Sequence, residues 1–131
     1  ILAGSQSAAQ SDTWATEIGR RAHALPRLIT TWQPVATGTS GGVTALGTAA
    51  GVLGALTLAT LAWLVGAPAR TAAWGLVGGV VGMLADSLMG ATVQGDEAGT
   101  PRGWRWFDND LVNFVACATG AGVALAGARW L

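Results

Sequence analysis

An acidic residue, Asp86, lies inside a long apolar stretch that runs from Ala72 to Gln94. An ionised side chain at the centre of a membrane helix costs ~2.5–3.5 kcal/mol on insertion scales, so such residues usually have a function. At helical spacing the acid shares one face with small and amide side chains, namely Gly79, Gly82, Gly90 and Gln94, with Ser87 beside them. Small residues let neighbouring backbones approach closely, so we expect Asp86 to face protein or enclosed water rather than lipid.

Other acidic residues could complete a Mg²⁺ site with Asp86. In proteins, Mg²⁺ typically binds one or two carboxylates and fills its remaining positions with water and substrate phosphates. The candidate metal ligands are Asp12, Asp86 and Asp110, and the candidate catalytic residues are Asp12, Glu17 and Asp86.

These acids also have structural interpretations. Asp86 could accept a hydrogen bond from one of three polar side chains, Thr44, Thr48 or Asn113. Asp108 is placed to cap a helix. Glu17 could form a surface ion pair of little energy with Arg20 or Arg21.

A glycine-rich segment, GTSGG, precedes the apolar stretch that begins at Val43. Glycines allow close approach of the backbone, and free N–H groups at the start of a helix attract phosphate. The candidate phosphate-binding residues are those of this segment and two nearby arginines: Gly38, Thr39, Ser40, Gly41, Gly42, Arg20 and Arg27. The alternative is that Thr39 or Ser40 caps the following helix and the glycines form the turn.

Amide and hydroxyl groups could add a polar cluster to these acids. They occur near the end of the stretch that holds Asp86 and at the start of the last apolar stretch: Ser87, Gln94, Asn109, Asp110 and Asn113. Such side chains form hydrogen bonds between membrane helices, although residues at a helix start can equally be caps. His23 and Cys117 stand apart from this set; we expect the first to be solvated and the second to pack within a helix.

The composition indicates which elements must position these residues. Hydrophobic residues make up 51% of the 131-residue chain and charged residues only 11%, whereas charged residues make up about 25% of a typical soluble domain. The mean hydropathy is +0.46. The zero formal net charge gives no indication of a nucleic-acid partner. These values predict an all-α fold, a polytopic membrane helix bundle in which residues 1–131 form a single domain.

Three apolar segments are long enough to cross a ~30 Å hydrocarbon core. They are Val43–Gly66, Ala72–Gln94 and Leu111–Leu131. Ile1–Gly19 is more polar, and we expect it to be a helix at the membrane edge or a partial span. The spans carry small residues four apart, such as Gly47 and Gly51, which favour close helix packing within the chain or in a homo-oligomer.

The arginines set the expected orientation. Alternating spans place the loops Arg20–Gly42 and Gly95–Asp110 on one side with five arginines, against two on the other. Positive residues favour the cytoplasmic side of a membrane. We therefore expect an integral protein of a bacterial inner membrane, with the GTSGG and Asp108 loops in the cytoplasm, where a nucleotide could reach them.

Four motifs occur in an order that resembles one known family. They are SDTWATEIG, PVATGTSGGVTALGTAAGVLGA, LADSLMGATVQ and WFDNDLVNF, and the resemblance covers the chain from about Gly4 to Gly122. This order is similar to the integral membrane family once catalogued as domain of unknown function ninety-two, which includes the phytyl-phosphate kinase of vitamin E synthesis. Members of that family usually carry further spans before the first motif, so the resemblance implies that this chain is the C-terminal part of a longer protein.

The resemblance implies a CTP-dependent kinase that uses Mg²⁺ to phosphorylate an isoprenoid (phytyl or polyprenyl) monophosphate. The motif positions that it carries over are Ser11, Asp12, Thr13, Glu17, Gly38, Thr39, Gly41, Gly42, Asp86, Ser87, Gly90, Gln94, Asn109, Asp110 and Asn113. On this hypothesis Asp86 holds Mg²⁺ with help from other acids, and GTSGG amides with one arginine, Arg20, Arg21 or Arg27, hold the triphosphate. The prenyl tail would lie along the glycine-rich grooves of Val43–Gly66 and Ala72–Gln94.

Two other classes of function fit the same residues. One is a small transporter or flippase-like protein in which Asp86 is an ion or proton site. The other is a non-catalytic membrane subunit whose small-residue faces bind partner helices.

Overall fold

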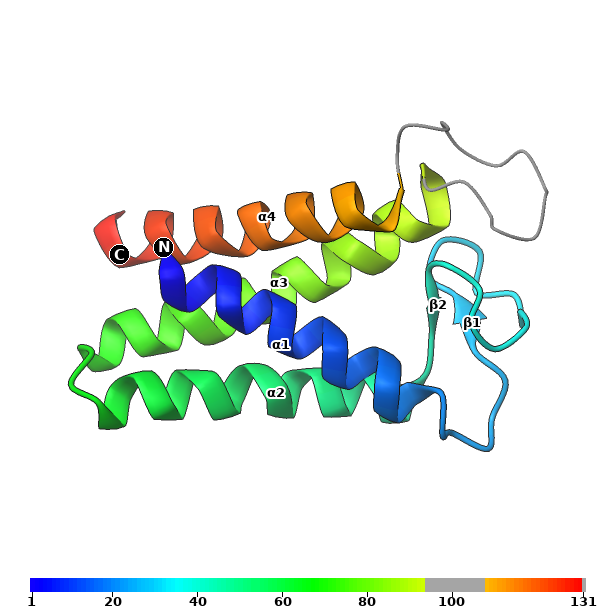
Figure 1. Cartoon of the computed structure of the whole chain (residues 1–131), viewed down its shortest axis with the longest axis horizontal. Helices are drawn as coiled ribbons and strands as arrows, with labels where there is room; N and C mark the ends of the chain where they lie inside the picture. The colour runs from blue at the N-terminus through cyan, green and yellow to red at the C-terminus, as the bar shows by residue number, and fades with distance from the viewer. Residues whose placement is uncertain (94–107, 131) are drawn as a thin grey trace.

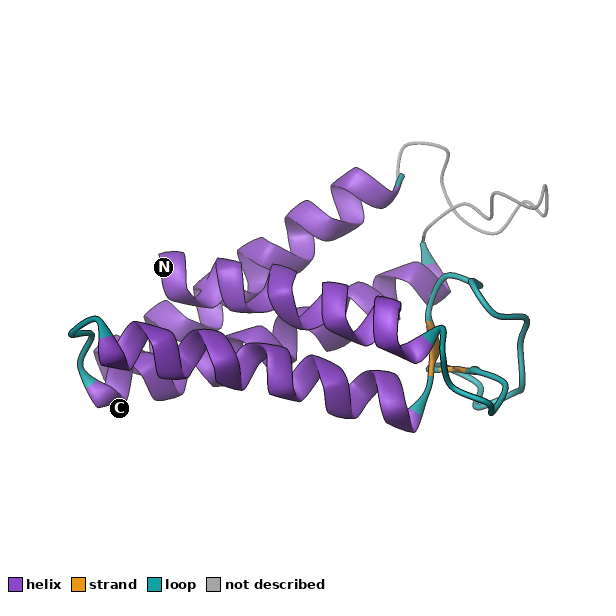
Figure 2. Ribbon diagram, turned by 60° about the horizontal axis from the view of Figure 1, so that its bottom comes forward, coloured by secondary structure: helices purple, strands orange, loops and turns teal. Residues whose placement is uncertain are grey.

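The computed structural model describes residues 1–93 and 108–130 of the chain. These residues form four α-helices and one pair of short strands: α1 (Leu2–Gly19), β1 (Arg27–Leu28), β2 (Gly42–Val43), α2 (Ala45–Leu64), α3 (Ala69–Thr92) and α4 (Asn109–Trp130). The helices form an elongated bundle, and both strands lie at one end of it (Figures 1 and 2). Gln94, a candidate site residue, lies outside the described residues.

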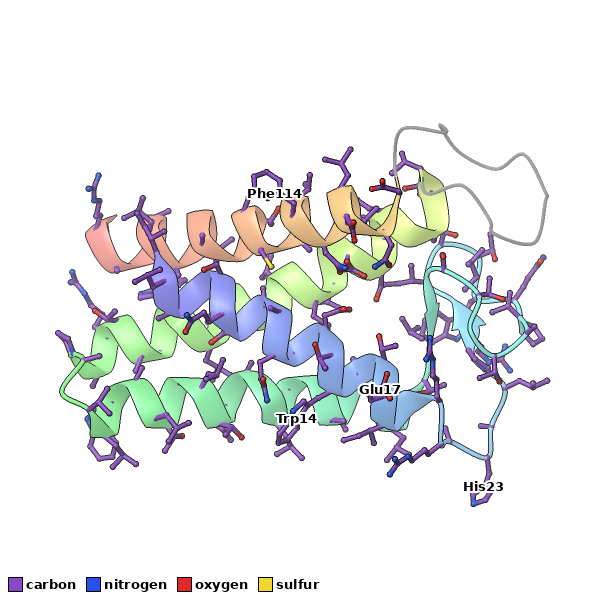
Figure 3. All side chains as sticks on the ribbon, viewed as in Figure 1. Trp14, Glu17, His23 and Phe114 are labelled. Carbon is purple, nitrogen blue, oxygen red and sulfur yellow. The ribbon has the colours of Figure 1, made fainter. Side chains whose placement is uncertain are left out.

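Three of these helices are long and apolar enough to cross a membrane: α2, α3 and residues Asn109–Arg129 of α4. The prediction of a membrane helix bundle with three clear spans is therefore confirmed. Large apolar side chains cover the outside of the bundle; Leu64 is 66% exposed and Phe114 is 70% exposed. Figure 3 shows Phe114 on the outer side of α4. The acyl chains of a bilayer are the natural cover for such a surface.

Helix α1 crosses the bundle diagonally and contacts the other three helices (Figure 1). Near its start, a Cβ on Gly4 would lie 2.5 Å from the carbonyl oxygen of Gly120 in α4, so only glycine lets these backbones meet. Near its end, a Cβ on Gly19 would lie 3.2 Å from the Cα of Gly47 in α2. Helix α1 is therefore close to α4 at its beginning and close to α2 at its end.

The glycine-rich faces of α2 and α3 are occupied by α1 and, at Gly78 and Gly82 of α3, also by α4. A Cβ on Gly47 would lie 2.6 Å from the Ala15 carbonyl oxygen, and a Cβ on Gly79 would lie 2.7 Å from the Ser7 Cβ. These faces join helices within the chain, as membrane helices with small residues commonly do. The expectation that a prenyl tail lies along them is wrong, because α1 leaves it no room, and the same contacts close these faces to a second copy of the chain.

The segment between Arg20 and Gly42, which was predicted to be a loop, also contains a short antiparallel strand pair, β1–β2. Arg27 lies opposite Val43 in this pair, and Leu28 lies opposite Gly42. The pairing turns residues 38–42 back over the end of α3. Gly41 has a φ of 76°, and a Cβ on it would overlap Ala91 of α3, so a glycine is required at this contact.

Candidate functional site

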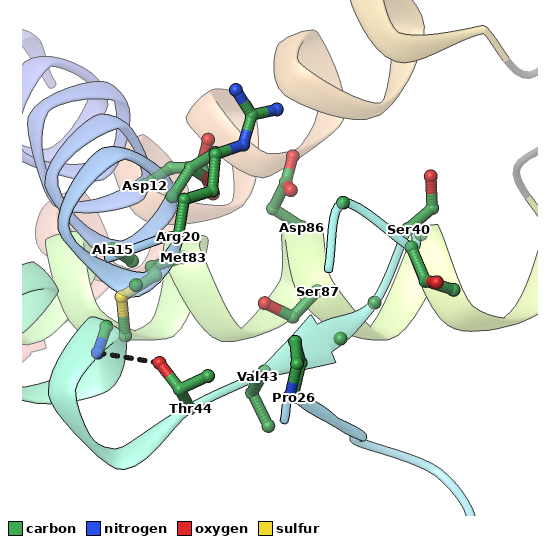
Figure 4. A pocket seen from close by; sticks show the side chains of 18 of the residues that line it. Asp12, Ala15, Arg20, Pro26, Ser40, Val43, Thr44, Met83, Asp86 and Ser87 are labelled. Atoms are coloured by element: carbon green, nitrogen blue, oxygen red, sulfur yellow. Dashed lines mark hydrogen bonds between the residues drawn. The ribbon is translucent and has the colours of Figure 1, made fainter. Parts of the chain in front are cut away.

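A polar cavity of about 360 Å³ lies at the end of the bundle that carries β1 and β2. Four parts of the chain line it: the second half of α1, residues 37–44 with the start of α2, residues 83–90 of α3, and the first turns of α4. Figure 4 shows the side chains that surround this space. The cavity exists because α1 diverges from α4 on its way toward α2, and the segment Gly38–Gly42 covers the space that this divergence leaves.

Two carboxyl groups from different helices share this cavity. Asp12 of α1 and Asp86 of α3 both line it, and the two groups are close enough to interact electrostatically. Oδ1 of Asp86 is buried and has no hydrogen-bond partner among the described residues. A buried acceptor that lacks a partner costs ~1–3 kcal/mol, so this oxygen is placed for a ligand that the described residues do not supply.

The donor set fits a Mg²⁺ ion that is completed by substrate. Within residues 1–93 and 108–130, no group of three or more His, Cys, Asp and Glu side chains converges on one point, which argues against a closed protein cage. Two adjacent carboxylates, one with an unpaired oxygen, are what Mg²⁺ needs when water and phosphates fill its other positions. Asp12 and Asp86 are the residues that would hold it.

Asp110, the third predicted metal ligand, does not join the other two. It is exposed in the first turn of α4 and does not line the cavity. Asn109 and Asn113 do line it, because residues four apart share a helix face while Asp110 projects about 100° away from Asn109. Asp108 accepts a hydrogen bond from the Leu111 N–H at 2.9 Å, which confirms it as the cap of this helix.

The GTSGG segment forms a tight turn at the mouth of the cavity, and all five of its residues line it. Gly42 N–H donates to the Thr39 carbonyl, and the Thr39 hydroxyl donates to the Ala36 carbonyl. In the described part of the chain, the N–H groups of Ser40 and Gly41 donate to no backbone carbonyl. Consecutive free N–H groups beside a glycine of positive φ are a typical anion-binding arrangement.

The segment is not the start of helix α2, contrary to the expected geometry. Thr44 is the N-cap, and its hydroxyl accepts a hydrogen bond from the Gly47 N–H at 3.0 Å. Neither Thr39 nor Ser40 caps the helix, because β2 separates them from it. The segment can bind phosphate through its own N–H groups, but without the helix dipole that the sequence interpretation invoked.

The two arginines predicted to bind phosphate have different positions. Arg20 lines the cavity, and its Nη1 lies 3.8 Å from Oε1 of Glu17, which also lines it. Because these two side chains are 57% and 64% exposed, the ion pair is weak and the guanidinium can turn toward an anion. Arg27 does not line the cavity; its Nη1 donates to the Trp32 carbonyl at 2.9 Å and fixes the β1 turn.

Among the remaining residues that the sequence singled out, some line the cavity and others do not. Ser87 lines the cavity beside Asp86 (Figure 4). His23 is exposed and points away from the bundle in Figure 3, as predicted. Ser11, which the family resemblance carried over, is fully buried outside the cavity lining. Its hydroxyl donates to the Gly51 carbonyl at 2.7 Å, so it joins α1 to α2.

Four threonines in the cavity lining were not predicted to be part of the site. They are Thr16, Thr37, Thr44 and Thr48. Thr44 and Thr48 lie four residues apart, so the helical spacing that grouped Asp86 with its neighbours could have found them.

The chain matches proteins of one membrane family. The family model described as "Integral membrane protein DUF92" matches residues 1–121. The "Uncharacterized membrane protein MJ0933" of Methanocaldococcus jannaschii is 38% identical over 114 residues, which cover 87% of this chain and 44% of that protein. "Protein VTE6, chloroplastic" of Arabidopsis thaliana is 33% identical over 117 residues, which cover 88% of this chain and 33% of that protein.

A second Arabidopsis thaliana relative, "Protein PGR", is 33% identical over 105 residues, which cover 71% of this chain and 36% of that protein. The chain thus spans less than half the length of these curated relatives. No solved structure matches it. The family model covers nearly the whole chain and the helices have the expected membrane character, so the chain belongs to the DUF92 family of integral membrane proteins.

Proposed function

We propose that this protein is a membrane kinase that transfers the γ-phosphoryl group of CTP to an isoprenoid monophosphate, such as a phytyl or polyprenyl phosphate. The observation that carries the proposal is the cavity that Asp86 and Asp12 share beneath the GTSGG turn, where Oδ1 of Asp86 has no partner in the described part of the chain. Carboxylates for a metal and free N–H groups for phosphate are the parts that phosphoryl transfer requires. The family resemblance supplies the substrate class.

In the proposed reaction, a phosphate oxygen of the lipid attacks the γ-phosphorus of CTP. The bond from that phosphorus to the β–γ bridging oxygen breaks, and CDP leaves with the electron pair. Mg²⁺, when bound, would neutralise charge on the phosphate oxygens. Asp12 and Asp86 would hold the metal in place, and the N–H groups of Ser40 and Gly41 would bind the triphosphate. Little covalent chemistry is left for the protein, so positioning supplies most of the rate.

The other cavity residues act on the charge and orientation of the two substrates. Arg20 lines the cavity, and its guanidinium can turn from the weak ion pair with Glu17 to bind the triphosphate. Asn109 and Asn113 offer amide donors to the lipid phosphate on the α4 side. The arginine bias of the loops supports a cytoplasmic position for the cavity in a bacterial inner membrane.

The test is turnover by the full-length protein reconstituted in lipid vesicles, with CTP, Mg²⁺ and an isoprenoid monophosphate. Asp86→Asn keeps the shape of the side chain and removes its charge, so we expect a loss of about 100-fold or more. Asp110→Asn is the matched control, because this exposed acid does not line the cavity, and we expect a change of less than about twofold. Unchanged turnover in Asp86→Asn would remove this residue from the mechanism.

An ion or proton site at Asp86 is the second candidate function, and the unpartnered Oδ1 favours it equally. A thermal-shift measurement separates the two. Stabilisation by Mg²⁺ with CTP supports the kinase, whereas stabilisation that follows pH or a monovalent cation and ignores nucleotides supports transport.

A further inference from the structure

A second cavity, of about 220 Å³, lies between α1 and α4. It shares Asp12, Thr13 and Asn113 with the polar cavity, so the two cavities are adjacent and meet at these side chains. Its other lining side chains are small: Ala8, Ala9, Ala116 and Cys117. The second cavity therefore leads from the polar groups toward the apolar middle of the bundle.

The angle between α1 and α4 explains this cavity. The two helices meet where Gly4 packs against Gly120, since a Cβ on Gly4 would lie 2.5 Å from the Gly120 carbonyl oxygen. Both helices still touch α3 one turn further on, where a Cβ on Gly82 would lie 2.5 Å from the Ala8 Cβ and 2.8 Å from the Ala116 carbonyl oxygen. Beyond that turn they separate, as Figure 1 shows.

This gap reaches the outer surface of the bundle. Ala9 and Thr13, which lie four residues apart on the outer face of α1, are exposed although they line the cavity. Asp12 and Ala8 are one helical turn apart, so the lining changes from charged to apolar over ~5–6 Å along α1. A ligand with an anionic head group and an apolar chain matches this change from a charged to an apolar lining.

We propose that the isoprenoid chain of the lipid substrate leaves the polar cavity sideways between α1 and α4, while its phosphate stays beside Asp12 and Asn113. This inference rests on the proposed function and adds the route and the residues that select the chain. The small side chains of Ala9 and Ala116 leave width for a methyl-branched chain. The glycine faces of α2 and α3 offer no such space, because α1 fills them.

Photolabelling tests the route without any need for turnover. The probe is an isoprenoid monophosphate with a diazirine on its second isoprene unit, added to the full-length protein in vesicles. We expect adducts on Ala9 to Thr13 of α1 and on Asn113 to Cys117 of α4. An excess of the unlabelled monophosphate should suppress them, and the matching alcohol should not. Adducts confined to the outer faces of α2 and α3, or suppressed equally by the alcohol, would overturn the route.

A substitution in the gap tests chain selection. Ala9→Phe places a ring in the gap at an exposed position, so the core is not disturbed. We expect kcat/KM for a monophosphate of four isoprene units to fall about tenfold or more, while the value for a single isoprene unit changes less than about threefold. Ala118→Phe is the control, since Ala118 is exposed on α4 and lines neither cavity. Equal loss for both substrates, or an equal effect in the control, would refute the proposal.

The two proposals fail separately in these experiments. Competed adducts between α1 and α4 without any phosphorylation would retain the lipid route and refute the kinase. Phosphorylation with adducts elsewhere and no effect of Ala9→Phe would retain the kinase and refute the route.

Discussion

Replacement of Gly41 by alanine tests whether the GTSGG turn binds a nucleotide. Gly41 has a φ of 76°, and a Cβ on it would lie 2.5 Å from the backbone nitrogen of Ala91. Real Cβ atoms essentially never lie within 3.0 Å of another heavy atom, so alanine at this position would clash. The left-handed backbone alone costs ~1–2 kcal/mol for a residue with a side chain. Relief of the clash requires the turn or the end of α3 to move by at least ~0.5 Å, at a further ~1–3 kcal/mol.

The shift moves the N–H groups of Ser40 and Gly41 away from the phosphate position. One hydrogen bond to a charged group is worth ~1.5–3 kcal/mol. We therefore expect the affinity for Mg²⁺ with CTP to fall by a factor of ~10–150 in Gly41→Ala, measured by calorimetry on the reconstituted protein.

Gly66→Ala provides the control for this experiment. Gly66 also has a positive φ, of 101°, but a Cβ there would meet nothing within 4 Å. It lies in the turn between α2 and α3, at the other end of the bundle from the cavity (Figure 1). We expect Gly66→Ala to lose stability and to keep its nucleotide affinity. Wild-type affinity in Gly41→Ala, or an equal loss in both variants, would refute the proposed role of the turn.

Two further predictions concern the elements that shape the cavity. Ser11→Ala removes the hydroxyl that donates to the Gly51 carbonyl between α1 and α2. We therefore expect a loss of ~0.5–2 kcal/mol in unfolding free energy, measured by denaturant unfolding in detergent. A loss no larger than that of Ser5→Ala, at a half-buried position whose hydroxyl bonds only within α1, would contradict it. Asp108→Ala removes the cap of α4. We expect it to lower the unfolding free energy by ~0.5–2 kcal/mol and Asp108→Asn to lower it less, because asparagine is also a good N-cap. Equal decreases in melting temperature for the two variants would argue against the cap.

The membrane fold could be predicted from the sequence because hydrophobic length is a local property. The three spans follow from apolar runs, and the stripe that holds Asp86 follows from helical spacing. The position of the GTSGG turn beside the end of α3 could be found only from the structure. The turn is directed there by the β1–β2 pair, and each strand of this pair is only two residues long. So short a pair has no alternation pattern that a sequence could reveal.

The errors arose where tertiary contacts decide the outcome. Stripes of small residues, such as those that contain Gly47 in α2 and Gly79 in α3, can contact either a bound lipid or a neighbouring helix. Only the diagonal course of α1 shows that a helix fills them. Asp110 follows Asn109 directly in the sequence, yet one residue on a helix turns a side chain by about 100°, out of the cavity. Sequence distance alone could not separate these two residues.

The central claim is that Asp12 and Asp86 together hold a divalent ion that a nucleotide completes. Electron paramagnetic resonance of Mn²⁺, used in place of Mg²⁺ with CTP on the reconstituted full-length protein, measures this directly. We predict a bound Mn²⁺ signal with phosphorus coupling in the wild-type protein and its loss in both Asp12→Asn and Asp86→Asn, with Asp110→Asn unchanged. A phosphorus-coupled signal that persists in both of the first two variants would contradict the account.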